Sequence, residues 1–333
     1  MVPVAASSPK MSTHTATGVV CLANDRMLEH LIALCSSLRK HDPDLSVTVL
    51  PFDDRLDSTR AVVADFGYTM FDGPSLAEMD AAGSRYWADG TGMPHIMRKF
   101  CAFWTAYQTF LFLDADIVVL CSLQPYFDAF ERSKADFMYF ATDVANVYLP
   151  GPVRERFVRD YATAGFNSGA FLSRRDAFSP PQVARLVDES ASVRSGFVDN
   201  LEQSFLNFSV DTARLSKVNA SDAVRELVGA GALMRIRRDG EAFRLADARM
   251  AESGRDVSMI HWAGYRCSPF MPYRGVFLDY RLGDAPRFAR VRFELSAVMR
   301  IVRETTLRQT YHILRRTPFH VKNFLAARGY VSW

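Results

Sequence analysis

Apolar residues follow two alternating periodicities along the first part of the chain. A β-rich run at residues 18–23 leads into a polar turn, with Asp25 as the expected N-cap of a helix at 27–39. The apolar residues at helical spacing in that segment are Leu28, Leu31, Ile32, Cys35 and Leu38. Residues 46–52 then predict a buried strand and 56–66 a second helix. Strands that alternate with helices in this way predict a mainly parallel sheet with helices on both faces.

Further along, a long polar segment precedes the remaining strands. Residues 71–94 are rich in Gly, Asp and Ser and predict a surface loop. The other expected elements are a helix of about four turns at 96–107, strands at 110–113, 137–140 and 167–173, and a loop that ends at residue 164. The expected fold class is therefore α/β, with a mixed, mainly parallel sheet flanked by helices.

Length and composition narrow the class of protein. The chain has 333 residues, of which 49% are hydrophobic and 23% charged, and its formal net charge is +3. These values exclude a disordered chain, a collagen-like repeat and a small disulfide-stapled scaffold. The near-zero charge argues against a nucleic-acid binder. No GxGxxG or GxxxxGK[ST] element supports a nicotinamide or P-loop site.

The cysteines and the apolar runs indicate the cellular compartment of the protein. Five cysteines are scattered without a CxxC pair or a Cys/His cluster, which favours a reducing cytosol and gives no zinc site. Residues 1–16 lack a basic segment followed by an apolar stretch, so we expect a disordered lead-in there. The longest apolar runs are far shorter than the roughly 20 residues of a membrane helix. We expect a cytoplasmic protein that does not span a membrane.

The most informative string is FLFLDADIVVL, where a buried apolar strand runs into Asp114, Ala115 and Asp116. Two carboxylates inside such a run are costly to bury unless something pairs with them. Residues i and i+2 of a strand share one face, which opens at the carboxyl end of a parallel strand into the ligand-binding crevice of α/β proteins. Oxygen ligands there suit a divalent ion that contacts a diphosphate. The alternative is a pair of N-capping or loop aspartates.

Five ordered segments resemble one known family. LANDRMLEHLIALCSSLRKH, MRKFCAFWTAYQTFLFLDADIVVL, FNSGAFL, EQSFLN and HWAGYRCSPF are similar to successive motifs of glycosyltransferase family 8, which includes glycogenin and bacterial lipooligosaccharide galactosyltransferases. The match spans roughly residues 17–275 in the right order. The resemblance implies a GT-A (Rossmann-like) domain at residues 17–280. It also implies a retaining transferase that takes a sugar from a nucleotide-diphosphate donor, most simply a UDP-sugar.

By this resemblance, Asp114, Asp116 and His261 would hold manganese or magnesium, and the ion would neutralise the diphosphate leaving group. His261 follows the strand-like VSMI, so a metal-facing position at a strand end is physically reasonable. Taken alone, a single His before a Trp is more often a packed core residue.

The resemblance also implies contacts to the donor nucleotide and sugar. The positions are Ala23, Asn24 and Asp25 for the base and ribose, Lys99 for the phosphates or sugar, Ala115 between the two aspartates, Asn167 for the sugar with Gly169 leaving room behind it, and Gly264 and Arg266 for the phosphates. The family's lysine is missing from the last motif, and Arg266 is its natural substitute because guanidinium clamps phosphate oxygens. Asn24 equally fits a plain N-capping turn, and the NSG string fits a simple turn into a strand.

Glu202 and Gln203 stand at the Asp-Gln positions of the family. In a retaining reaction the group beneath the sugar stabilises an oxocarbenium-like state. The resemblance gives this position to Gln203, and a sugar-hydroxyl or acceptor contact to Glu202. Because glutamate replaces the aspartate, Asp199 is an alternative source of the carboxylate. Both Glu202 and Gln203 also fit a solvated helix face.

The segment at residues 281–333 differs from the rest of the chain. It has 11 Lys and Arg and three acids, a net charge of +8 that leaves −5 for the residues before it. Apolar residues recur between the arginines at helical spacing, at Phe288, Val291, Leu295, Val298 and Val302. A basic amphipathic helix suits an anionic membrane surface and would permit peripheral contact at the inner face of the membrane. It equally suits packing against an acidic body with the arginines outward, and this second interpretation is slightly favoured.

The sequence thus indicates a metal-dependent retaining glycosyltransferase with a glycan, lipid-linked or small-molecule acceptor and no nucleic-acid partner. A phosphatase of the haloacid dehalogenase class also places DxD after an apolar strand. That class expects Thr or Ser soon after the second Asp, where IVVL stands here. A non-catalytic nucleotide-sugar-binding protein is a third possibility, against which the intact metal ligands argue.

Overall fold

The computed structural model describes residues 15–90, 92–198, 202–224, 226–229, 236–239, 242–245, 256–264, 267 and 271–316. The chain divides into two units, Met1–Ala263 and Gly264–Trp333. The expected lead-in at residues 1–16 lies outside the described residues as far as residue 14, and the first strand begins at Thr15.

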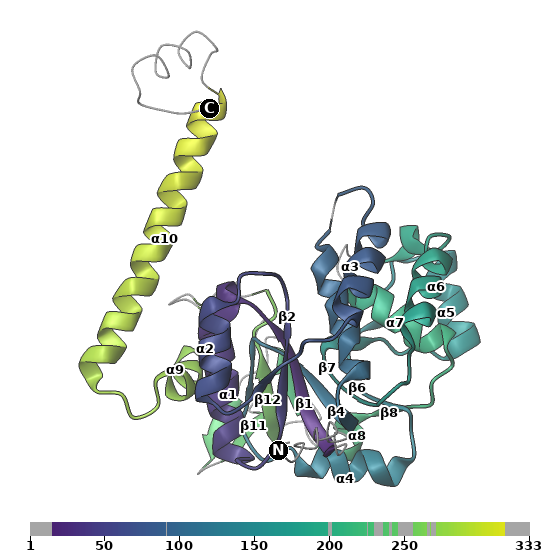
Figure 1. Cartoon of the computed structure of the whole chain (residues 1–333), viewed down its shortest axis with the longest axis horizontal. Coiled ribbons are helices and arrows are strands. Elements are labelled where there is room, and N and C mark those ends of the chain that lie inside the picture. Colours follow the sequence, from purple (N-terminus) through teal and green to yellow (C-terminus); the bar gives the residue numbers. More distant parts are fainter. Residues whose placement is uncertain are drawn as a thin grey trace, which may run out of the picture. The chain divides into compact units, whose positions relative to one another are not determined.

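A seven-stranded sheet in the order β3-β2-β1-β4-β7-β6-β8 forms the centre of the first unit (Figure 1). Its strands are β1 (Thr15–Ala23), β2 (Val47–Pro51), β3 (Thr69–Met70), β4 (Tyr107–Asp114), β6 (Phe137–Ala141), β7 (Phe166–Arg174) and β8 (Lys217–Asn219). β1 pairs parallel to β2 and β4, β3 pairs parallel to β2, and β8 pairs parallel to β6. Only β7 runs antiparallel to its neighbours β4 and β6. The expected mixed, mainly parallel sheet is confirmed.

Helices cover both faces of this sheet because side chains alternate along each strand. In β1, Val19 and Cys21 face one apolar core, and Val20 and Leu22 face the other. The first core also contains residues of α1 (Leu28–His41), α2 (Asp57–Asp65), α4 (Gln124–Ser133) and α8 (Ala220–Ala223). The second contains residues of α3 (Ser75–Tyr86), the 3-10 helix η2 (Pro94–Trp104), α5 (Pro152–Tyr161), α6 (Pro180–Ser190) and α7 (Glu202–Thr212).

A small three-stranded sheet extends the first unit beyond β4. It consists of β5 (Ile117–Val119), β12 (Val257–His261) and β9 (Glu226–Gly229), with β12 in the middle, antiparallel to β5 and parallel to β9. β10 (Ile236–Asp239) and β11 (Ala242–Leu245) form a separate antiparallel pair. Short 3-10 helices η1 (Asp25–Met27), η3 (Val144–Asn146) and η4 (Arg194–Gly196) lie in the connections.

Two expected loops contain helices, and one expected helix differs in its type and its end point. The segment at 71–94 contains α3, whose Met79, Ala82 and Tyr86 are buried despite the polar residues between them. The helix expected at 96–107 is the 3-10 helix η2, and β4 already begins at Tyr107 because this strand continues the buried sheet. The loop expected before residue 164 contains α5, which packs through Phe157.

The first turn is capped differently from the expectation. Asn24 caps η1, because its Oδ1 accepts a hydrogen bond from the backbone N–H of Arg26 at 3.0 Å. Asp25 instead accepts from the backbone N–H of Thr59 at 2.8 Å and from that of Ser58 at 3.3 Å, in the first turn of α2. Asp25 therefore ties the end of β1 to α2 and does not cap the helix that follows it.

The second unit contains α9 (Arg274–Leu282) and α10 (Arg287–Arg316), so the helical C-terminal extension is confirmed as far as residue 316. Residues 317–333 of the expected segment lie outside the described residues. Within the described part of the chain, no helix combines the length and the apolar character needed to cross a bilayer.

Candidate functional site

The Asp-Ala-Asp string forms the turn between β4 and β5. β4 ends at Asp114 and β5 begins at Ile117, with the side chain of Ala115 buried between the two aspartates. β4 lies between β1 and β7 in the large sheet, so the turn stands at the carboxyl end of an inner strand. The two carboxylates converge through this turn, and not through the pleat of one continuous strand as expected.

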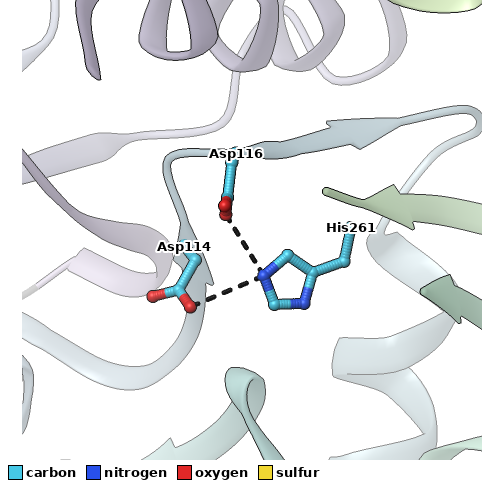
Figure 2. A group of neighbouring side chains, drawn as sticks. All are labelled: Asp114, Asp116 and His261. Carbon is cyan, nitrogen blue, oxygen red and sulfur yellow. Dashed lines mark ion pairs between the residues drawn. The ribbon is translucent and has the colours of Figure 1, made fainter. Parts of the chain in front are cut away.

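His261 reaches the same point from the other end of the sequence. Ile117 pairs with His261 across β5 and β12, and the backbone N–H of Trp262 donates to the carbonyl of Asp116 at 3.0 Å. Nε2 of His261 is 3.1 Å from Oδ1 of Asp116 and 3.6 Å from Oδ2 of Asp114 (Figure 2). One ligand atom from each of the three side chains lies within 4.8 Å of the others.

Gly169 provides the space in which these side chains meet. It lies in β7, antiparallel to β4, and has no left-handed backbone angle. A Cβ atom at this position would collide with the imidazole ring of His261 and stand 2.7 Å from Oδ2 of Asp114. The requirement for glycine is therefore one of space and not of conformation.

Burial and the neighbouring charges shift the pKa values of these three side chains in opposite directions. Burial raises the pKa of Asp114 above its usual range, and the positive charge of Lys99 offsets part of this rise. Burial also acts to raise the pKa of Asp116, but the proximity of His261 outweighs it and the pKa lies below the ordinary value. For His261, burial acts to lower the pKa, and Asp116 more than compensates, so the pKa is raised.

The donor set fits a divalent cation. It offers carboxylate oxygens from Asp114 and Asp116 and an imidazole nitrogen from His261, and all three side chains are at most partly exposed. Nδ1 of His261 is buried and has no hydrogen-bond partner among the described residues, so Nε2 is the ring atom that faces the carboxylates. Carboxylate oxygens and an imidazole nitrogen are both ordinary ligands of divalent metal ions in proteins.

Behind the aspartates, a buried ion pair joins η2 to α7. Lys99 Nζ lies 3.1 Å from Oδ1 of Asp114, donates to the carbonyl of Ser168 at 3.1 Å, and donates to Glu202. Ser168 Oγ also donates to Glu202, at 2.9 Å. Burial alone would lower the pKa of Lys99 and raise that of Glu202. The charges of Asp114 and Glu202 reverse the shift of Lys99, and the charge of Lys99 reverses that of Glu202. Both groups are therefore charged, and Lys99 is surrounded by protein groups.

The beginning of α7 is joined to β7 by side-chain amides. Gln203 Oε1 accepts from the N–H of Ser168 at 3.3 Å, and its Nε2 donates to the carbonyl of Asn146 at 3.1 Å. Asn207, one turn further on, accepts from the N–H of Phe166 and donates to the carbonyl of the same residue, both at 3.0 Å. Glu202 is only 4% exposed, which excludes the alternative that it lies on a solvated helix face.

Asn167 lies within β7, next to these contacts. Its Oδ1 accepts from the N–H of Gly169 at 2.7 Å, which is a local turn-like hydrogen bond inside the strand. The same Gly169 borders Asp114 and His261. Asn167 thus lies at the edge of the carboxylate cluster, and its hydrogen bond to a donor sugar stays a prediction.

The end of β1 forms a second polar cluster. Ala23 and Asn24 are buried, and Asn24 acts as the capping residue described above. Asp53, after β2, was not singled out from the sequence, although the string FDDR at a strand end carries the signal. Burial acts to raise the pKa of Asp53, but hydrogen bonds from Arg55 and from the Asn24 side chain lower it. Arg55 Nε lies 3.0 Å from Oδ2 of Asp53.

Three of the expected site residues are not part of this cluster as described. Asp199 and Arg266 lie outside the described residues. Gly264 belongs to the second unit and has a φ of 75°, which favours glycine. The structure therefore brings together Asp114, Asp116 and His261.

Comparison with known proteins shows which fold the chain has. No protein-family model matches the chain, and no curated protein does so either. Among solved structures, the galactosyltransferase LgtC in complex with donor and acceptor sugar analogues has a TM-score of 0.57 and 13% identity, with 82% of this chain and 99% of LgtC covered. The bifunctional glycosyltransferase WbbM has a TM-score of 0.54 and 14% identity over 87% of this chain. The chain has a GT-A fold.

The chain covers different shares of these structures. The chain spans 53% of the WbbM chain, so it corresponds to about half of that bifunctional protein. An active-site mutant of LgtC matches with a TM-score of 0.55 and 16% identity, again over 99% of its length. Within the GT-A fold of the present chain, the carboxylate–imidazole cluster lies where β4 leaves the large sheet.

Proposed function

We propose that the chain is a metal-dependent retaining glycosyltransferase of the family 8 type. It moves a sugar from a nucleotide-diphosphate donor, most simply a UDP-sugar, to a hydroxyl acceptor. The observation that carries this proposal is the convergence of Asp114, Asp116 and His261 at the carboxyl end of β4. In open α/β sheets, ligands bind in the crevice at the carboxyl ends of the strands.

Asp114, Asp116 and His261 would hold Mn²⁺ or Mg²⁺. When bound, the ion supplies positive charge that neutralises the diphosphate leaving group. Gly169 keeps the space for this cluster free of side-chain atoms. Lys99 balances the negative charge of Asp114 and Glu202 from behind. Its charge lowers the pKa of Glu202 and offsets part of the rise that burial causes in the pKa of Asp114.

The donor would extend from the end of β1 toward β7. Ala23, Asn24 and Asp25 follow β1 and would line the base and ribose, with the carboxylate of Asp53 held next to Asn24. Asn167 would hydrogen-bond the sugar from β7. The contacts of Gly264 and Arg266 to the phosphates are part of the same proposal.

The structure suggests a refined role for Lys99. A lysine that contacts donor phosphates needs a free ammonium edge, but this side chain is 2% exposed and already contacts Asp114, Ser168 and Glu202. We therefore assign Lys99 to positioning: it fixes the carboxylate of Asp114 and the first turn of α7.

Catalysis would depend on the start of α7. Gln203 presents a side-chain amide whose orientation is set by the backbone of Ser168 and Asn146. An amide that is already oriented stabilises developing positive charge without reorganisation. Glu202 is turned toward Lys99, which leaves Asp199 as the carboxylate to test for contact with the sugar or acceptor. That LgtC has an active-site mutant of a glutamine supports the choice of Gln203.

The acceptor is proposed to be a glycan, a lipid-linked sugar or a small molecule with a free hydroxyl. LgtC binds donor and acceptor sugar analogues, which supports a carbohydrate acceptor. The five cysteines are free thiols, in keeping with the proposed cytoplasmic location.

The experiment is a screen of nucleotide sugars for slow hydrolysis or transfer to simple glycosides, with and without Mn²⁺. NMR of the released sugar reports the anomeric configuration before mutarotation. Metal-dependent release with retained configuration supports the proposal. Release of phosphate from simple phosphomonoesters, with a phosphorylated Asp114, would instead establish a phosphatase. Binding of a nucleotide sugar without any turnover would establish a binding protein.

A further inference from the structure

α10 presents an apolar stripe that the other described residues of the second unit do not cover. Its members are Phe288, Val291, Leu295, Val298, Met299 and Val302, which are 41% to 71% exposed. Successive residues of a helix turn by about 100°, so these six positions fall within an arc of about 100°. Apolar side chains scattered singly over a surface are ordinary, but a continuous stripe on one helix face marks a binding surface.

The opposite face of α10 is held by α9. Arg274 donates to both carboxylate oxygens of Glu294, at 3.0 and 2.9 Å. Arg290 donates to Asp279 at 3.1 Å and to the carbonyl of Gly283 at 3.0 Å. These bonds fix the rotation of α10 about its axis. The stripe therefore faces away from α9.

Arginines border the stripe on both edges. Arg292 and Arg303 follow one edge and Arg287 the other, and all three are exposed. α10 contains eight Arg and two Glu. One of the two, Glu294, is already neutralised by Arg274. The border of the stripe is therefore positively charged.

We infer that this face of α10 binds an anionic membrane surface, lying in the plane of the interface. A bilayer with acidic headgroups offers the apolar side chains a place to be buried and the bordering arginines negative partners at the same depth. The helix is too polar to cross the bilayer. The inference concerns only the second unit and stands whether or not the proposed transfer reaction is correct.

A second copy of the chain is one competitor for the stripe. If two stripes packed against each other with twofold symmetry, the arginine borders would face arginines, since the described side chains of the border include no free acid. Helix pairs of this kind are stable when the residues that flank the apolar seam have opposite charges. The charge pattern therefore favours a surface that is uniformly anionic.

Sedimentation of the full-length chain with lipid vesicles tests this inference. We expect binding to phosphatidylcholine vesicles that contain phosphatidylglycerol, and little binding to phosphatidylcholine alone. The charge variant is Arg292→Gln with Arg303→Gln, and its matched control is Arg159→Gln with Arg185→Gln, two exposed arginines of α5 and α6. The apolar variant is Val291→Ser with Val302→Ser, and its control is Val158→Ser, an exposed valine of α5.

Both α10 variants should weaken vesicle binding by about tenfold or more, and both controls should bind as the wild type does. Unchanged thermal melting of all four would show that they fold. Equal binding of variants and controls, or no binding of the wild type, would overturn the inference. Self-association in analytical ultracentrifugation that is lost in the valine variant, without vesicle binding, would assign the stripe to a second copy. Donor hydrolysis, measured in parallel, reports on the proposed function separately.

Discussion

Gly169 of β7 lies so close to His261 of β12 that a methyl group on residue 169 would overlap the imidazole ring. The two residues are far apart in sequence and belong to different sheets. Asp114 and His261 can therefore approach each other only because residue 169 is a glycine and has no side chain.

Gly169→Ala should weaken Mn²⁺ binding by about 10–100-fold, because the new methyl group displaces His261 or Asp114 from its position. Isothermal calorimetry measures the affinity, and thermal melting shows whether the fold is retained. Gly275→Ala is the control, since this glycine lies in α9 and a Cβ there meets no other atom within 4 Å. Equal affinity of Gly169→Ala and wild type would show that the site does not need this space.

Lys99→Met should destabilise the protein by about 3–5 kcal/mol, because it leaves the buried carboxylate of Glu202 without its partner. Urea denaturation measures the free energy of unfolding. The double variant Lys99→Met with Glu202→Gln should lose much less than the sum of the two single changes.

The surface pair Arg85–Asp188 provides the matched comparison for Lys99. Its side chains are 53% and 70% exposed and 3.9 Å apart, so Arg85→Met should change the stability very little. Additive effects of Lys99→Met and Glu202→Gln would contradict a coupled buried pair.

Mn²⁺ binding should weaken as the pH falls. Asp116 raises the pKa of His261 despite burial, so the imidazole retains its proton to higher pH than a free histidine. A ligating imidazole must be neutral, so metal binding releases this proton. Below the pKa of His261, the affinity should fall by about tenfold for each pH unit. In His261→Gln the affinity is lower throughout, and its pH dependence near neutrality should be flatter. A wild-type affinity that stays constant from pH 8 to pH 5 would exclude His261 as a ligand.

Acid should remove a stabilising contribution from Asp80. Burial acts to raise the pKa of this carboxyl, but the hydrogen bonds from Arg98 and His95 outweigh it and lower the pKa. A lowered folded-state pKa gives stability that is present above the unfolded pKa of about 3.9 and is lost as the pH falls through the folded value. Asp80→Asn should therefore be less stable than wild type at pH 7, and the difference should shrink below about pH 4. A difference for Asp80→Asn that is independent of pH would contradict this account.

The buried strands were the most predictable part of the fold. β1, β4 and β7 follow continuous apolar runs, and their observed bounds lie close to the predicted ones. α3 was missed because its buried residues Met79, Ala82 and Tyr86 are separated by Asp, Gly and Ser. Asp, Gly and Ser are typical of loops. The sequence alone does not show the surface against which the apolar residues of α3 pack.

The site was predictable where a motif is local, and not where it depends on pairing across the chain. Asp114 and Asp116 stand out because carboxylates interrupt an apolar run. The ion pair of Lys99 with Glu202 joins η2 to α7 across 103 positions, and no local pattern indicates it. The capping role of Asn24 was one of two open alternatives, and the geometry supports it without testing a contact to a nucleotide.

The central claim is that Asp114, Asp116 and His261 form a metal site through which a nucleotide diphosphate is bound. Calorimetry of UDP binding in the presence of Mn²⁺, and again after chelation with EDTA, tests it most directly. We predict that UDP binds the wild type only with the metal, and that Asp116→Asn weakens this binding by about 100-fold while Asp188→Asn leaves it unchanged. UDP binding that persists in EDTA and in Asp116→Asn would contradict the account.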